Sequence, residues 1–214
     1  MWELGVKVLI AYLLGTVLGS LVLGRLRGVD IRRMGSGNAG ATNALRTQGR
    51  LFGFLVLLID IAKGVIAVRW LPGAALPQVA ADPGLSREWL TLACACAVIA
   101  GHVYPVWFDF RGGKGAATVA GVVAALDWRL VPPLFLGWFL VLLLTGYVGL
   151  ATMLSGIALI LAVLVIEPAD AALLWFCAAV TAFIVYTHRG NIARMRAGQE
   201  HRVRRLWLFR SRAA

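Results

Sequence analysis

A glycine-rich polar segment in the first quarter of the chain has the residue types that hold phosphate. It runs from Gly35 to Arg46 and reads GSGNAGATNALR. Glycines let a backbone turn its N–H groups toward an anion, and short polar side chains add neutral donors. Arg46 lies one helical turn after Thr42 and offers a planar fork of donors that fits a phosphate. The candidate ligands are Ser36, Gly37, Asn38, Gly40, Thr42, Asn43 and Arg46.

A second glycine-rich segment surrounds a lysine. Residues 111–118 read RGGKGAAT and follow GHVYP, which begins at Gly101. A lysine between glycines at the start of a helix can place a point charge on phosphate. The candidates are Gly112, Gly113, Lys114, Gly115 and His102. Two structural interpretations stay open: a basic membrane anchor at Lys114 and a buried, hydrogen-bonded His102.

Neither segment fits a nucleotide-binding motif in its required context. Gly35, Gly37 and Gly40 match GxGxxG, but a dinucleotide site needs a preceding strand, and here an apolar helix and a basic turn precede. A Walker A loop needs Ser or Thr directly after its lysine, and Gly115 stands there instead.

A third polar segment begins at the end of the last apolar run. His188 and Asn191 lie three residues apart, so they share a face if the helix continues. Both side chains can hold hydroxyl or phosphate oxygens, and Glu200 follows in an AGQE sequence. The arginines beyond it are typical of a basic interfacial tail.

The composition indicates a membrane protein. The 214 residues are 60% hydrophobic and 14% charged, whereas soluble domains carry about a quarter charged residues. We predict one all-α integral membrane domain, residues 1–214, in which seven transmembrane helices form a bundle with cytoplasmic glycine-rich loops. The predicted spans are residues 4–23, 51–70, 89–108, 116–126, 130–145, 147–166 and 171–187. The fourth span is short because Asp127, Pro132 and Pro133 interrupt the apolar run.

Basic residues set the predicted orientation. The net charge is +11, and the basic residues gather at 24–50, at 111–114 and after residue 188. The positive-inside rule puts these segments in the cytoplasm, so the N-terminus lies outside and the C-terminus inside. The expected partners of this charge are membrane lipids and anionic substrates, not nucleic acid. The first apolar run is interpreted as a retained span and not as a signal peptide.

Other titratable residues indicate structural roles. Asp60 and Lys63 lie three apart within an apolar span, where an ion pair is the favoured interpretation and a substrate contact the minor one. The three histidines are scattered and the cysteines lie in apolar runs. We therefore predict no metal and no cofactor.

The three polar segments together resemble the bacterial acyl-phosphate:glycerol-3-phosphate acyltransferase family, known as PlsY. The resemblance covers nearly the whole chain and keeps the order of the motifs. It implies a seven-helix fold in the bacterial inner membrane with a cytoplasmic site. It also implies acyl transfer from acyl phosphate to the 1-hydroxyl of glycerol 3-phosphate, the first acylation of phospholipid synthesis, giving 1-acylglycerol 3-phosphate and phosphate. By resemblance, the residues that contact the reacting substrates are Ser36, Arg46, Lys114, His188 and Asn191.

One region departs from the family pattern. Family members usually carry serine where this chain has Gly149, and arginine is common at the position of Gly146. A substrate contact there is either missing or supplied by Thr145 or Thr152.

The residues indicate direct transfer without a covalent enzyme intermediate. No nucleophile–base–acid triad is visible, and His102 precedes Asp109 by seven positions where an HxxxxD acyltransferase needs five. The glycerol hydroxyl would then attack the acyl phosphate, and its proton would pass to His188 or to a phosphate oxygen of the donor. Two other functions share some features: an organic-anion transporter shares the basic pocket, and a membrane scaffold shares the basic tail. The outer halves of the spans carry few polar residues, which disfavours the transporter, and the glycine-rich segments disfavour the scaffold.

Overall fold

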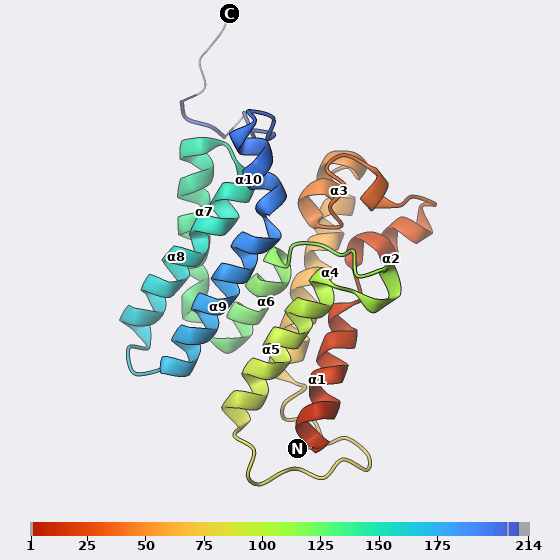
Figure 1. Cartoon of the computed structure of the whole chain (residues 1–214), viewed down its shortest axis with the longest axis vertical. Helices are drawn as coiled ribbons and strands as arrows, with labels where there is room; N and C mark the ends of the chain where they lie inside the picture. The colour runs from red at the N-terminus through yellow and green to blue at the C-terminus, as the bar shows by residue number, and fades with distance from the viewer. Residues whose placement is uncertain (1, 205, 210–214) are drawn as a thin grey trace, which may run out of the picture. The chain divides into compact units, whose positions relative to one another are not determined.

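The computed structural model describes residues 2–204 and 206–209, and these residues fold into helices joined by loops, the longest of which connects α4 to α5 (Figure 1). The first unit of the chain contains α1 (Trp2–Gly15), α2 (Gly19–Leu26), η1 (Ile31–Arg33), α3 (Ala41–Gln48), α4 (Arg50–Arg69), α5 (Arg87–Val103), η2 (Val106–Phe108) and α6 (Ala116–Leu126). The second contains η3 (Trp128–Leu130), α7 (Val131–Thr145), α8 (Val148–Ile166), α9 (Ala171–Thr187) and α10 (Arg189–Arg196). Here η marks a short 3₁₀ helix. The all-helical prediction is confirmed.

The chain forms two compact units, Met1–Leu126 and Asp127–Ala214, which we call unit 1 and unit 2. Within unit 1, α1 packs on α5, and α4 packs on α3 and α6. Within unit 2, α8 packs on both α7 and α9. The single domain expected from the sequence stays a prediction.

Glycines bring the helices of unit 1 into close backbone contact. A Cβ added to Gly15 or Gly101 would collide with the backbone of the facing helix, α5 or α1. Likewise, a Cβ added to Gly64 of α4 would collide with the backbone of α6, and one added to Gly121 of α6 would collide with the backbone of α4. Small residues at such crossings are how helices associate in a membrane, where lipid gives little hydrophobic driving force between them.

The helices are long and apolar enough to cross a bilayer. Among the described residues, four helices meet this criterion alone, and two bent helix pairs raise the number of candidate spans to six. The short α6 has the predicted bounds, 116–126, and would be the seventh. Each of the seven predicted segments contains helix, although 4–23 and 89–108 are each interrupted, and their number as membrane spans stays a prediction.

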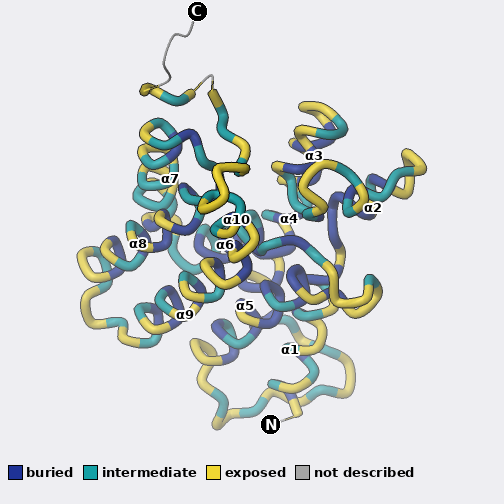
Figure 2. The backbone as a smooth tube through the Cα atoms, turned by 45° about the horizontal axis from the view of Figure 1, so that its top comes forward, coloured by how far each residue is buried: buried dark blue, intermediate teal, exposed yellow. Residues whose placement is uncertain are grey.

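Many large apolar residues of unit 2 are exposed. The yellow segments of α7 and α8 mark exposed residues on these helices (Figure 2). In α7 only Leu142 is buried, while Phe135, Leu136 and Phe139 are about half exposed or more. Large exposed apolar patches are rare on soluble monomers. A helix that is apolar on all sides fits a lipid environment.

The first predicted span, 4–23, is not one helix, and this part of the prediction is wrong. It breaks between Gly15 and Gly19, and α1 and α2 are bent by 48°. Lys63 Nζ donates to Gly15 O at 2.8 Å and to Val17 O at 2.9 Å. A buried lysine thus satisfies carbonyl groups that the break leaves without helical partners, which is a recognised cause of sharp helix kinks.

Candidate functional site

The first glycine-rich loop is organised around the side chain of Asn43. Asn43 is 2% exposed. Its Nδ2 lies within hydrogen-bond distance of the carbonyls of Ile31, Met34 and Asn38, and its Oδ1 accepts from Ser36 N at 3.0 Å. The side chain of Asn43, predicted as a phosphate ligand, therefore hydrogen-bonds within the loop and fixes the shape of the loop.

Glycines let this loop turn tightly over Asn43. Gly35 and Gly37 have positive φ angles of 54° and 72°. A Cβ on Gly35 would also collide with Asn43 Oδ1. The residue between these glycines, Ser36, stays exposed at the surface of the loop.

The loop leads directly into α3. Gly40 is its N-cap residue, so the first turn of α3 directs backbone N–H groups and the positive end of the helix dipole toward the loop. Thr42 lies in this first turn and Arg46 one turn later, and both are exposed. Ser36, Thr42, Arg46 and the start of α3 thus combine neutral donors, a cation and a helix terminus, which is a suitable set for phosphate.

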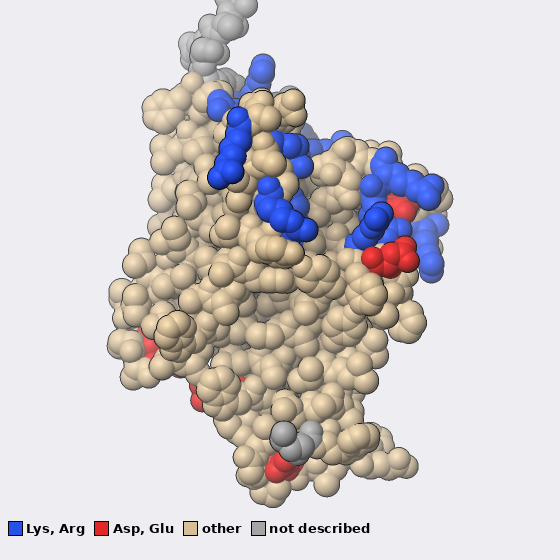
Figure 3. Space-filling model, viewed as in Figure 1, with Lys and Arg blue, Asp and Glu red and all other residues tan. Residues whose placement is uncertain are grey.

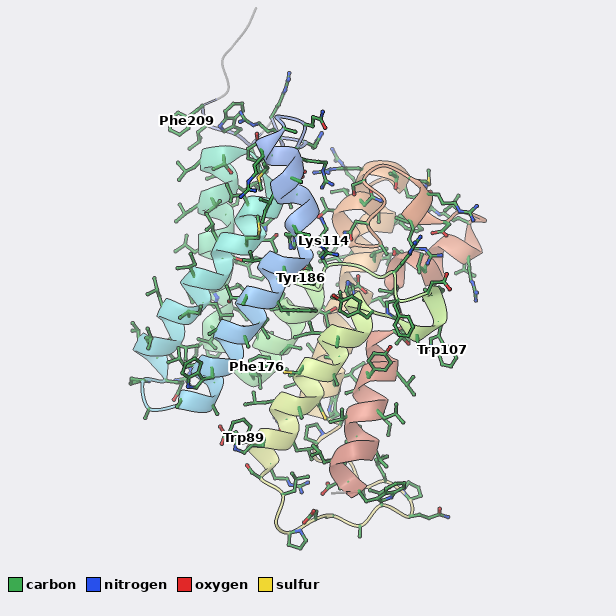
Figure 4. The ribbon with its side chains drawn as sticks, in the orientation of Figure 1. Trp89, Trp107, Lys114, Phe176, Tyr186 and Phe209 are labelled. Carbon is green, nitrogen blue, oxygen red and sulfur yellow. The ribbon has the colours of Figure 1, made fainter. Side chains whose placement is uncertain are left out.

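The second glycine-rich loop packs against the end of α5. Gly113 N donates to His102 O and Gly112 N donates to Val103 O, both at 3.1 Å. A Cβ at Gly112 would collide with His102 O, and one at Gly113 would collide with His102 Nε2. Only glycines fit at these two positions. Lys114 follows them and lies before the start of α6 (Figure 4).

His102 lies beneath this loop and not on its surface. It is 2% exposed, and its Nδ1 lies 3.5 Å from Asp60 Oδ1. Asp60 Oδ1 in turn lies 3.2 Å from Lys63 Nζ, so the ion pair expected between Asp60 and Lys63 is confirmed. Sequence reasoning placed this pair correctly but missed its link to His102, because residues 60 and 102 are far apart in the chain.

In unit 2, His188 joins α9 to α10. The two helices are bent by 52° at this residue. His188 Nδ1 lies 2.8 Å from Ile184 O, and a carbonyl oxygen can only accept, so Nδ1 carries the proton. A neutral imidazole in this tautomer has its lone pair on Nε2, as a proton acceptor requires.

Asn191 is oriented by Glu200. Asn191 Nδ2 donates to Glu200 Oε1 at 2.8 Å, and Arg194 Nε donates to Glu200 Oε2 at 2.7 Å. The Glu200 side chain is only 6% exposed. Glu200, predicted as a substrate ligand, therefore holds the side chains of Asn191 and Arg194 in place.

Gly149 makes room for Asn191. A Cβ at Gly149 would lie 2.8 Å from Asn191 Nδ2 and 3.0 Å from its Cγ. Thr145 and Thr152, whose hydroxyls were the alternatives to the family's serine at position 149, use these hydroxyls in structural hydrogen bonds. Thr145 Oγ1 donates to Val141 O, and Thr152 Oγ1 donates to Val148 O while accepting from Trp138 Nε1.

The predicted residues fall into two groups, one in each unit. Unit 1 holds Ser36, Gly37, Asn38, Gly40, Thr42, Asn43, Arg46, His102, Gly112, Gly113, Lys114 and Gly115. Unit 2 holds His188, Asn191 and Glu200. In each unit considered alone, Lys and Arg side chains gather at one end, over α2 in unit 1 and over α10 in unit 2 (Figure 3). The meeting of the two groups at one site stays a prediction.

Comparison with known proteins identifies relatives of this architecture. Residues 6–198 match the family described as glycerol-3-phosphate acyltransferase. The glycerol-3-phosphate acyltransferase of Aquifex aeolicus (strain VF5) is 38% identical over 196 residues, which cover 91% of this chain and 96% of the relative. That of Staphylococcus aureus (strain JH9) is 40% identical over 204 residues, which cover 93% and 97%.

Solved structures show the same fold. A crystal structure of PlsY (YgiH), described as an integral membrane glycerol 3-phosphate acyltransferase in its glycerol 3-phosphate form, has a TM-score of 0.79 at 36% identity and covers 93% of this chain and 94% of its own. Its lysophosphatidic acid form has a TM-score of 0.77 with the same identity and coverage. The chain is thus a multi-pass integral membrane protein with the PlsY fold, and it belongs to the glycerol-3-phosphate acyltransferase family.

Proposed function

We propose that this protein transfers a fatty acyl group from acyl phosphate to the 1-hydroxyl of sn-glycerol 3-phosphate. The products are 1-acyl-sn-glycerol 3-phosphate, which is lysophosphatidic acid, and inorganic phosphate. The reaction is the first acylation of bacterial phospholipid synthesis at the inner membrane. The related structures support this proposal, since one is a glycerol 3-phosphate form and the other a lysophosphatidic acid form. The basic segments favour a cytoplasmic active site and C-terminus, with the N-terminus outside.

The observation that carries the proposal is the pair of glycine-rich loops in unit 1. The first is fixed by Asn43 and presents Ser36 with the start of α3. The second is fixed against α5 and presents Lys114. Two phosphate-binding loops suit a reaction in which donor and acceptor both carry phosphate.

The chemistry needs positioning more than activation. Acyl phosphate is a mixed anhydride, whose phosphate is a good leaving group. The glycerol oxygen attacks the carbonyl carbon, the new ester C–O bond forms, and the anhydride C–O bond breaks to release phosphate. Arg46 and Lys114 offset the repulsion between the two anionic substrates. Holding the two substrates in a reactive geometry lowers the activation free energy by roughly 7–11 kcal/mol.

The hydroxyl proton has two possible acceptors. One is His188, whose Nδ1–H tautomer supports proton acceptance at Nε2. The other is a phosphate oxygen of the donor. Replacing His188 with Asn separates them, because substrate assistance predicts that most of the rate persists and histidine catalysis predicts a loss of about 10²–10⁴-fold.

The donor is tested by one comparison. Purified protein is given glycerol 3-phosphate with palmitoyl phosphate, palmitoyl-CoA or palmitoyl-acyl carrier protein, and lysophosphatidic acid is measured. We expect efficient product formation only from palmitoyl phosphate, with one phosphate released per product. Preference for a thioester would contradict the donor assignment, and no acylation with any donor would contradict the function.

A further inference from the structure

We propose that His102, Asp60 and Lys63 are positioning residues that set the geometry of both glycine-rich loops of unit 1 for glycerol 3-phosphate. We call these three residues the Asp60 cluster. The proposal rests on the proposed function. In this proposal the three buried side chains affect substrate binding through the two loops and do not touch the substrate.

The first link runs from His102 to the loop of Lys114. The main chain of His102 accepts a hydrogen bond from Gly113 N, and its ring occupies the space that a side chain at position 113 would need. The other edge of the ring faces Asp60 Oδ1 at 3.5 Å. The imidazole is therefore held between the loop and the carboxylate, and a shift of the ring moves the residue that precedes Lys114.

The second link runs from Asp60 and Lys63 to the break between α1 and α2. Lys63 Nζ donates to Gly15 O and Val17 O, and Gly19 N donates to Asp60 Oδ1 at 3.4 Å. The two charged groups thus contact both sides of the break and fix where α2 begins.

The third link runs from α2 to the first glycine-rich loop. Ser20 Oγ, in the first turn of α2, donates to Ala39 O at 2.6 Å. Leu18, Leu21 and Ala39 also form one buried apolar cluster. The position of α2 therefore determines the position of residues 36–40. Because the Asp60 cluster fixes where α2 begins, the position of these loop residues depends on the Asp60 cluster as well.

Stability alone does not account for these charges. Asp60, Lys63 and His102 are each at most 2% exposed. Asp60 Oδ2 and His102 Nδ1 have no hydrogen-bond partner among the described residues. Buried ion pairs of this kind are often no more stabilising than apolar residues of similar size. Their position between two substrate-binding loops gives them a function that apolar residues would not supply.

The main test replaces His102 with Leu, which keeps the volume and leaves the Asp60–Lys63 pair intact. We expect the KM for glycerol 3-phosphate to rise about 10–100-fold, as loop displacements of an ångström can produce. The KM for the acyl donor should change less than threefold. His102→Asn should recover part of the loss, because its amide nitrogen can replace Nδ1 toward Asp60.

The matched control is Glu3→Gln, which alters the buried Glu3–Lys7 ion pair of α1. The partners of Glu3 are Lys7, Arg87 and the main chain of Asp82, and none of these residues belongs to either glycine-rich loop. It should lower the melting temperature and leave both KM values unchanged. If His102→Leu lowers the melting temperature as Glu3→Gln does but leaves the KM for glycerol 3-phosphate unchanged, the proposal is overturned.

A milder variant covers the case in which His102→Leu does not fold. Ser20→Ala removes a single hydroxyl and should raise the KM for glycerol 3-phosphate about threefold at an unchanged melting temperature. An unchanged KM would overturn the link through α2. The wild-type protein decides the proposed function separately, because its acylation of glycerol 3-phosphate is measured without any variant.

Discussion

Two charged clusters tie α1 to other parts of unit 1, and they differ in how well their buried polar atoms are satisfied. In the cluster of Glu3, Lys7 and Arg87, both Glu3 oxygens accept hydrogen bonds from Arg87, and Lys7 Nζ also donates to Pro72 O at 2.7 Å. In the Asp60 cluster, one carboxylate oxygen and one imidazole nitrogen have no hydrogen-bond partner among the described residues. The first arrangement is typical of a structural clamp.

The difference separates stabilisation from positioning. A bidentate arginine–carboxylate pair fixes geometry and satisfies its own atoms. A cluster that leaves polar atoms unsatisfied calls for a further explanation. The Asp60 cluster lies against the glycine-rich loop at Gly113, whereas Glu3 bonds to the connection between α4 and α5 through Asp82 N. The contrast favours a stabilising role for the cluster of Glu3, Lys7 and Arg87, and it supports the positioning role proposed for the Asp60 cluster.

The largest expected effect comes from the cations that the loops present. Arg46→Ala and Lys114→Ala should each lower kcat/KM at least 10³-fold, because each leaves a substrate phosphate without its main countercharge. That loss corresponds to about 4 kcal/mol of transition-state stabilisation. Steady-state acylation assays at low substrate, with the melting temperature as a folding control, measure it. Near-native turnover in either folded variant would refute the proposal that Arg46 and Lys114 hold the phosphates of the two substrates.

The next effect concerns stability at the Glu3 cluster. Glu3→Gln leaves the buried Lys7 without its carboxylate and should clearly lower the melting temperature. Adding Lys7→Met should recover most of the loss, since the uncompensated charge is then gone. Thermal unfolding in detergent tests both variants. A double variant that is less stable than Glu3→Gln would contradict the stabilising role of the Glu3–Lys7 ion pair.

A smaller effect is expected where Asn191 packs against Gly149. Gly149→Ala should displace the Asn191 side chain by a few tenths of an ångström and lower kcat/KM about tenfold, within the range that small misplacements produce. Gly5→Ala is the matched control, because a Cβ at Gly5 meets nothing within 4 Å. Equal activity of the two variants would show that Asn191 tolerates the shift.

The smallest effect belongs to a partly exposed ion pair. The Arg32 guanidinium beside Asp30 holds the pKa of that carboxyl below its ordinary value of 3.8. The folded state then binds the Asp30 proton more weakly than the unfolded state, so the stabilisation is present above pH 3.8 and fades as the pH falls below it. Asp30→Asn should lower stability by under about 1 kcal/mol at pH 7, because exposed pairs are screened by solvent. At pH 3 the difference between the two melting temperatures should shrink, and an equal difference at both pH values would contradict this account.

The sequence predicted the helices well because their signals are local. Asp127 and the prolines at 132 and 133 mark the end of α6 and the start of α7, and the predicted bounds of α6 agree with the structure. The break after Gly15 escaped prediction because its cause, Lys63, lies in another helix.

The candidate site shows the same contrast between features that are local in the sequence and features that depend on contacts with other segments. The glycines and cations of the loops are visible as residue types, whereas the structural roles of Asn43 and Glu200 depend on which acceptors and donors surround them. Asn43 bonds to carbonyls as far back as Ile31, and Glu200 bonds back to Asn191 and Arg194. A polar side chain that holds a loop together and one that holds a substrate look alike in a sequence.

Rapid-quench measurement of phosphate release from palmitoyl phosphate tests direct acyl transfer, the central claim, most directly. With glycerol 3-phosphate present, we expect phosphate and lysophosphatidic acid to appear together in equal amounts from the first turnover. Without glycerol 3-phosphate, we expect no burst. A burst of phosphate equal to the enzyme concentration in the absence of the acceptor would reveal an acyl-enzyme and contradict the account.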